Sequence, residues 1–197
     1  PRQTPLENIS SLLRTPRLQI ALLFMICLML GQFSIIPFIS PYMVSNVGFK
    51  EDELPYIYLI GGGLTIFSSP LIGKWADKAG KLPVFRVFAL VVLIPILAIT
   101  HIGAVGLPLA LSATTLFFVC AGGRMIPAMA MITSAPEPRQ RGAFMSLSSS
   151  VQQLSAGIAS YMAGSIVVEN ADKTLSNYEY VGYVAVFFTL GAFVISG

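Results

Sequence analysis

Two apolar runs joined by a short basic turn occupy residues 54–100, LPYIYLIGGGLTIFSSPLIGKWADKAGKLPVFRVFALVVLIPILAIT. Each run is long enough to cross about 30 Å of hydrocarbon as a helix, because an α-helix rises about 1.5 Å per residue. The turn places the carboxylate of Asp77 among the ammonium groups of Lys74, Lys78 and Lys81. This pattern predicts two membrane-spanning helices that are joined on one side of a bilayer.

The rest of the chain repeats this alternation of apolar runs and short polar connections. Of its 197 residues, 55% are hydrophobic and 11% are charged, whereas a soluble domain carries roughly a quarter charged residues. The positions of charges, Pro and Gly place spans at residues 18–40, 55–73, 84–100, 107–133, 143–168 and 180–197. We therefore predict an all-α polytopic membrane protein, in which a cytoplasmic linker or lead-in (residues 1–17) precedes a bundle of six transmembrane helices (residues 18–197).

The basic residues gather on one side of the predicted bundle. Nine of the twelve Lys and Arg residues precede the first span or lie in the second-to-third or fourth-to-fifth connection: Arg2, Arg14, Arg17, Lys74, Lys78, Lys81, Arg86, Arg139 and Arg141. The opposite connections hold Lys50 and Lys173 among six acidic residues. Lys and Arg near spans are retained in the cytoplasm, so this side and both chain ends are predicted to be cytoplasmic.

The composition argues against several classes of function. The two cysteines, Cys27 and Cys120, lie inside apolar runs, so the sequence offers no disulfide framework. His101 is the single histidine and has no Cys or carboxylate near it in the sequence. The dispersed basic residues lack the aromatic interleaving of a nucleic-acid surface. We therefore expect no catalytic residues, no metal, no cofactor and no nucleic-acid partner, and we expect the lipid bilayer as the surrounding medium.

Arg124 is a charged residue deep inside a predicted span, the fourth. A charge in hydrocarbon costs about 3 kcal/mol even on the lenient insertion scale, so such residues normally face the bundle interior or a polar cavity. At about 1.5 Å per residue, Arg124 lies about 16 Å from the predicted cytoplasmic end of its helix. Two interpretations stay open: the side chain serves a substrate cavity or proton coupling, or it snorkels to the interface.

Polar side chains also follow helical spacing in the fifth span, which is the least hydrophobic. Ser148, Gln152 and Ser155 share one face of this predicted helix. The stripe faces either a lumen or a neighbouring helix with which it forms hydrogen bonds. Gln32, alone among apolar residues of the first span, is a further cavity candidate. Tyr42, near the outer end of that span, is interpreted as an interfacial anchor.

The turn at residues 73–81 has a distinctive spacing, made by Gly73, Asp77, Lys78, Gly80 and Lys81. It resembles the signature loop of the major facilitator superfamily: Gly, three residues, Asp, Arg or Lys, one or two residues, Gly, and Arg or Lys. Lys stands here where the stronger form has Arg. The pairs Gly123-Arg124 and Arg141-Gly142 are similar to the fourth helix of a superfamily half and to the start of its fifth.

The resemblance covers nearly the whole chain and implies a secondary transporter that works by alternating access. Such transporters have two six-helix halves, each built from three-helix units with inverted topology. This chain would be one half, with a second half in the same parent chain. The basic lead-in favours the second half, while the first half stays open. Similarity to bacterial drug and sugar efflux permeases implies a proton-coupled antiporter that exports a small molecule across the bacterial inner membrane.

The resemblance also assigns expected roles to residues. Gln32, Arg124, Ser148, Gln152 and Ser155 are substrate-cavity candidates, and Gly73, Asp77, Lys78, Gly80, Lys81 and Arg141 form a candidate conformational latch. The carboxylate of Asp77 is expected to pair with a basic residue, and the nearest candidates are in the connection at residues 139–141. The alternative function is a non-transporting six-helix scaffold or channel subunit. Because the chain begins at Pro1 and ends inside an apolar run, we expect it to be a segment of a longer protein.

Overall fold

The computed structural model describes residue 12 and residues 14–197, so the predicted lead-in lies largely outside the described residues. The described helices are α2 (Pro16–Phe33), α3 (Ile36–Tyr42), the π-helical turn η1 (Met43–Val47), the 3-10 turn η2 (Glu51–Glu53), α4 (Leu54–Ala79), α5 (Lys81–Val91), α6 (Leu93–His101), α7 (Leu107–Ser134), α8 (Arg141–Ile166) and α9 (Tyr178–Ile195). Two short strands, β1 (Val168–Glu169) and β2 (Leu175–Ser176), pair antiparallel. The protein is all-α apart from this hairpin.

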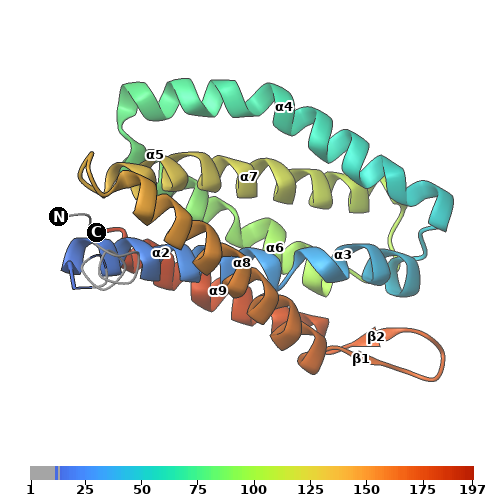
Figure 1. Cartoon of the computed structure of the whole chain (residues 1–197). Coiled ribbons are helices and arrows are strands. Elements are labelled where there is room, and N and C mark those ends of the chain that lie inside the picture. Colours follow the sequence, from blue (N-terminus) through green and yellow to red (C-terminus); the bar gives the residue numbers. More distant parts are fainter. Residues whose placement is uncertain (1–11, 13) are drawn as a thin grey trace.

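These elements form six antiparallel spans (Figure 1). The first span combines α2, α3 and η1, and the third combines α5 and α6. Five spans of the described chain are long and apolar enough to cross a membrane: Pro16–Val47, Glu51–Ala79, Lys81–His101, Leu107–Ser134 and Tyr178–Ile195. The remaining span, α8, is long enough, but its serines and glutamines reduce its hydropathy. The bundle is thus a membrane domain whose fifth helix is the most polar.

The contacts between helices follow a twofold pattern. α4 packs mainly against α7, which also packs against α5; in the same way, α8 packs mainly against α2, which also packs against α9. Exchanging α2 with α7, α4 with α8 and the α5–α6 span with α9 therefore reproduces the main contacts. The two three-helix units run in opposite directions in Figure 1. This is the packing expected of an inverted repeat.

A break separates α2 from α3 in the middle of the first span. Pro37 has no N–H, so the Phe33 carbonyl four residues earlier loses its helical donor. The Ser160 hydroxyl of α8 lies within hydrogen-bond distance of that carbonyl, at 3.4 Å. The Tyr178 hydroxyl of α9 donates to the Ile35 carbonyl at 3.0 Å. Neighbouring helices thus supply donors to the interrupted backbone, as a membrane interior requires.

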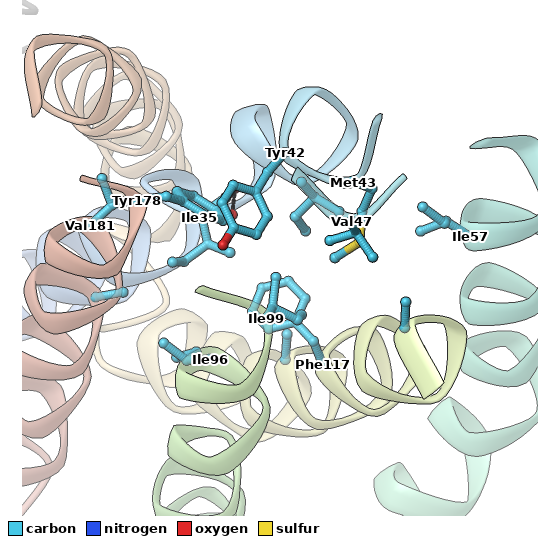
Figure 2. Packing of buried hydrophobic residues seen from close by; sticks show 14 of the residues in the cluster. Ile35, Tyr42, Met43, Val47, Ile57, Ile96, Ile99, Phe117, Tyr178 and Val181 are labelled. Carbon is cyan, nitrogen blue, oxygen red and sulfur yellow. Dashed lines mark hydrogen bonds between the residues drawn. The ribbon is translucent and has the colours of Figure 1, made fainter. Parts of the chain in front are cut away.

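Apolar side chains fill one end of the bundle, which we call the acidic end because residues 50–53 and 168–179 lie there. Figure 2 shows side chains of four spans pointing toward one another: Ile35, Met43, Val47, Ile96, Ile99, Phe117, Tyr178 and Val181. Tyr42 lies in the same cluster and is 7% exposed. Its hydroxyl donates to the Ile102 carbonyl at 2.9 Å. The interpretation of Tyr42 as an interfacial anchor is therefore wrong, because its side chain is buried in this cluster and does not face the lipid.

Glycines bring pairs of helices into close contact. A Cβ added to Gly61 of α4 would lie 2.7 Å from the Phe118 ring of α7, and one added to Gly123 of α7 would lie 2.5 Å from the Phe88 ring of α5. Real side chains do not approach this closely, so these positions admit no larger residue without movement of the ring. Small residues at contacts are typical of membrane helices, whose association depends on close packing.

The turn between the second and third spans is shorter than the sequence indicates. α4 continues through Gly73 and Asp77 to Ala79, Gly80 is the single non-helical residue, and α5 begins at Lys81. The extension is helical because it has an apolar face: Ala76 is buried in a cluster with Val84 of α5. The residues expected to form a loop are therefore mainly the last turns of a helix. The opposite end of the bundle from the acidic end, here called the basic end, carries this turn and residues 135–141.

Replacing Gly80 by Ala should lower the free energy of unfolding of the full-length protein by about 1–3 kcal/mol, because a side chain is strained at a backbone φ of 95° and ψ of 145°. Gly73→Ala is the matched control, since an added Cβ there meets nothing within 4 Å. That change should be neutral or stabilising by up to about 1 kcal/mol, because Gly weakens a helix. Unfolding of the purified variants in detergent measures both effects. Equal losses at the two positions would contradict this account of the turn.

Candidate functional site

Arg124 of α7 is 1% exposed and ends between two neighbouring spans. Its Nη1 donates to Thr189 Oγ1 of α9 at 2.6 Å, and its Nη2 donates to Gln32 Oε1 of α2 at 2.9 Å. These three residues are called the Arg124 cluster. The guanidinium therefore joins three spans inside the bundle and does not reach the membrane surface. A direct role in a substrate cavity stays a prediction.

The partners of Arg124 in the described chain are neutral. Neither Gln32 nor Thr189 carries a charge, and Arg124 Nε is buried without a hydrogen-bond partner. Hydrogen bonds from a charged donor contribute about 1.5–3 kcal/mol each. Losing one acceptor leaves a buried charge less compensated, which is strongly destabilising. The position of Arg124 thus depends on both acceptors.

A glycine directly precedes Gln32 and another directly precedes Arg124, the two residues whose side chains are hydrogen-bonded to each other. Gly31 of α2 allows α9 to approach, since a Cβ there would lie 3.0 Å from Thr189 Oγ1. Gly123 of α7 plays the same part toward α5. α2 and α7 hold equivalent places in the twofold pattern of contacts, as do α9 and the α5–α6 span. Gly31 therefore contacts α9 and Gly123 contacts α5, which belongs to the span equivalent to α9. The Gln32 and Arg124 side chains meet between the two three-helix units.

The polar stripe of α8 belongs to a helix that packs mainly against α2. Ser148 is 3% exposed and Ser155 is 4% exposed. Gln152 is partly exposed. No hydrogen bond within the described chain links these three residues to the Arg124 cluster, and the Ser148 hydroxyl is buried without a partner. The apolar Leu154, by contrast, is 67% exposed. The structure thus brings Gln32 and Arg124 together and keeps the three α8 candidates apart from them.

The residues of the candidate latch lie together at the basic end. Asp77 and Lys78 are exposed near the end of α4, and Arg141 is exposed at the first residue of α8. Asp77 has no ion pair or side-chain hydrogen bond in the described part of the chain. No described basic residue therefore forms the expected pair with Asp77 in this conformation. The latch stays a prediction about a second conformation.

The acidic end has a contact that the sequence did not indicate. Asn46 of η1 uses its side-chain amide as a strand would use its backbone: Nδ2 donates to the Leu175 carbonyl, and Oδ1 accepts from the Leu175 N–H, both at 2.8 Å. The two Asn46 hydrogen bonds thereby attach the hairpin to the end of the first span. Within the hairpin, hydrogen bonds from the Thr174 hydroxyl and N–H lower the pKa of the Asp172 carboxyl.

Sequence reasoning missed Thr189, Tyr178 and Gly31, which position the residues it singled out. Thr189 had a weak signal, because it is a polar residue in the middle of an apolar run, as Gln32 is. A Thr in a helix commonly bonds its own backbone, so this signal does not distinguish a partner of Arg124. Thr114 of α7 shows that ordinary case, with its hydroxyl 3.1 Å from the Ala110 carbonyl.

The fold and site define an integral membrane protein with inverted three-helix units and a polar cluster enclosed between them. No group of His, Cys, Asp and Glu residues in the described chain could hold a metal ion. The family model described as Major Facilitator Superfamily matches residues 3–196. The chain therefore belongs to the major facilitator superfamily, whose members are secondary transporters and not enzymes. No curated protein and no solved structure matches the chain.

Proposed function

We propose that the chain is one six-helix half of a proton-coupled antiporter that exports a small molecule. The family match over residues 3–196 carries this proposal, because transporters of this family pair two six-helix halves. The basic residues before α2 and the Lys-containing turn favour the second half, with the first half encoded in the same parent chain. A non-transporting scaffold or channel subunit is the weaker alternative, since the family consists of transporters.

The proposed location is the bacterial inner membrane, with the basic end in the cytoplasm. Nine of the twelve Lys and Arg residues lie in the sequence before the apolar run that starts at Leu18, in the segment 74–86 around the turn at Gly80, or at residues 139–141. Both termini of the described chain lie at the same end of the bundle in Figure 1. Retention of Lys and Arg in the cytoplasm then places both termini there.

We propose that the cavity is lined by polar residues of the first, fourth and fifth spans. Gln152 is partly exposed and can contact a ligand directly from α8, whereas Ser148 and Ser155 are buried in this conformation. Arg124 contributes through Gln32, because its hydrogen bond holds the Gln32 amide one residue before the end of α2. A carboxylate that carries protons lies in the other half, since the described spans place Arg124 but no acidic residue at midspan.

Arg124→Ala should abolish gradient-driven transport, because Gln32 and Thr189 lose their shared donor. The measurement uses the full-length protein in proteoliposomes with an imposed proton gradient, a panel of fluorescent cationic dyes, and radiolabelled sugars. Arg14→Ala is the matched control, since it removes an exposed basic residue at the membrane surface. Unchanged flux in Arg124→Ala at equal protein amounts would end the proposed role of Arg124. Absence of flux of every probe in the wild type would contradict drug or sugar export.

The turn containing Asp77 is proposed as a latch that stabilises one access state. Such a latch pairs the Asp77 carboxylate with a cation in one state and leaves it exposed in the other, as seen here. Asp77→Asn should therefore shift the ratio of inward to outward accessibility. Labelling of single cysteines from each side of the membrane measures that ratio, with Glu137→Gln as a control carboxylate at the same end. An unchanged ratio in Asp77→Asn rules out the latch.

A further inference from the structure

A pocket with a volume of about 370 Å³ opens at the basic end of the bundle, between the ends of α2, α7 and α9. Its wall is mainly apolar and includes Phe24 of α2, Ile132 of α7 and Ile195 of α9. Two polar side chains complete the lining, Arg17 and Ser196. Neither the Arg124 cluster nor the turn at residues 73–81 contributes to it. The pocket is therefore separate from the proposed transport machinery.

The polarity of the lining changes along the bundle axis. Arg17 is the second residue of α2 and immediately precedes the apolar run that begins at Leu18. Ser196 immediately follows Ile195, the last residue of α9. The helix ends that carry Arg17 and Ser196 thus lie where spans leave the hydrocarbon, while Phe24 lies about 10 Å deeper, at about 1.5 Å per residue. A ligand that fits this gradient has a polar head at the interface and an apolar tail inside the bilayer.

The charge at the mouth of the pocket is positive, and no residue of the described chain pairs with it. Arg17 is exposed and makes no ion pair or side-chain hydrogen bond with the described part of the chain. A second guanidinium, that of Arg86 in α5, does not line the pocket. It stacks on Phe193 of α9 at 5.4 Å and lies against Gly197, the residue after Ser196. Arg86 Nε is buried without a hydrogen-bond partner. Guanidinium groups bind phosphate oxygens well, because their donors match the geometry of the anion.

We propose that this pocket binds one anionic phospholipid from the leaflet at the basic end. The phosphate lies at Arg17, the Ser196 hydroxyl donates to a headgroup oxygen, and the first part of an acyl chain lies against Phe24 and Ile132. Basic pockets between spans bind anionic headgroups in this way. The occupant is a membrane lipid, because the apolar wall continues to the depth of the hydrocarbon, where a free phosphate ion would gain nothing.

The test titrates detergent-solubilised full-length protein with phosphatidylglycerol, phosphatidylcholine or inorganic phosphate. Native mass spectrometry counts the molecules of each that are bound. Three variants are compared with the wild type. Arg17→Ala removes the cation at the mouth, Ala135→Phe fills the pocket from the residue that follows α7, and Arg14→Ala removes an equal charge outside the lining. Arg17 and Arg14 are exposed, so both Arg variants are expected to fold, and their comparison decides the test even if Ala135→Phe is unstable.

The proposal predicts one tightly bound phosphatidylglycerol and weaker binding of phosphatidylcholine. Arg17→Ala should weaken phosphatidylglycerol binding about fivefold, since a basic residue near the headgroup contributes about that factor. Ala135→Phe should weaken both lipids, and Arg14→Ala should change neither. Equal binding of the two lipids to the wild type would overturn the proposal. An equal effect of Arg14→Ala and Arg17→Ala on phosphatidylglycerol binding would also overturn it. So would binding of inorganic phosphate as tight as that of phosphatidylglycerol.

Discussion

The Arg124 guanidinium needs hydrogen-bond acceptors at a depth where the bilayer supplies none, and the arrangement of three spans follows from meeting that need. Thr189 and Gln32 provide the acceptors from α9 and α2. Gly31 allows this close approach, because a Cβ there would lie 3.0 Å from Thr189 Oγ1 and would push that side chain away. In this way one buried charge fixes how closely three helices pack. Interhelical polar contacts of this kind replace the hydrophobic driving force that is absent between helices in lipid.

The same constraint explains the irregular first span. The proline at position 37 leaves the Phe33 carbonyl without its helical donor, and a membrane interior requires another protein group to bond it. Tyr178 and Ser160 supply hydroxyls from α9 and α8 just beyond the Arg124 cluster. The break in the first span is therefore surrounded by side chains from the second three-helix unit. Since the two units meet at Gln32 and Arg124, a movement of one unit would be transmitted to this break.

The sequence predicted the parts of the fold that depend on local pattern. The apolar runs predicted the positions of the six spans, and the helical spacing of its serines and glutamines predicted that the fifth is the most polar. Gln32 and Arg124 were both identified as polar residues in apolar surroundings. Their pairing was not predictable, because they are separated by 92 residues and belong to different three-helix units. The turn at residues 73–81 was expected to be a loop because it is charged. It is helical because Ala76 packs against the next helix, a tertiary contact that composition does not show.

The central claim is that the hydrogen bond between Arg124 and Thr189 stabilises the folded protein. A double-mutant cycle with Arg124→Leu and Thr189→Val in the full-length protein measures the coupling free energy between the two residues. Unfolding free energies in detergent should give a coupling of about 1–2 kcal/mol, as for a strong interhelical hydrogen bond. Thr114→Val is the control, because Thr114 is equally buried on α7 but bonds its own helix. Its coupling to Arg124 should stay below about 0.5 kcal/mol. A coupling for Thr189 as small as that for Thr114 would contradict the account.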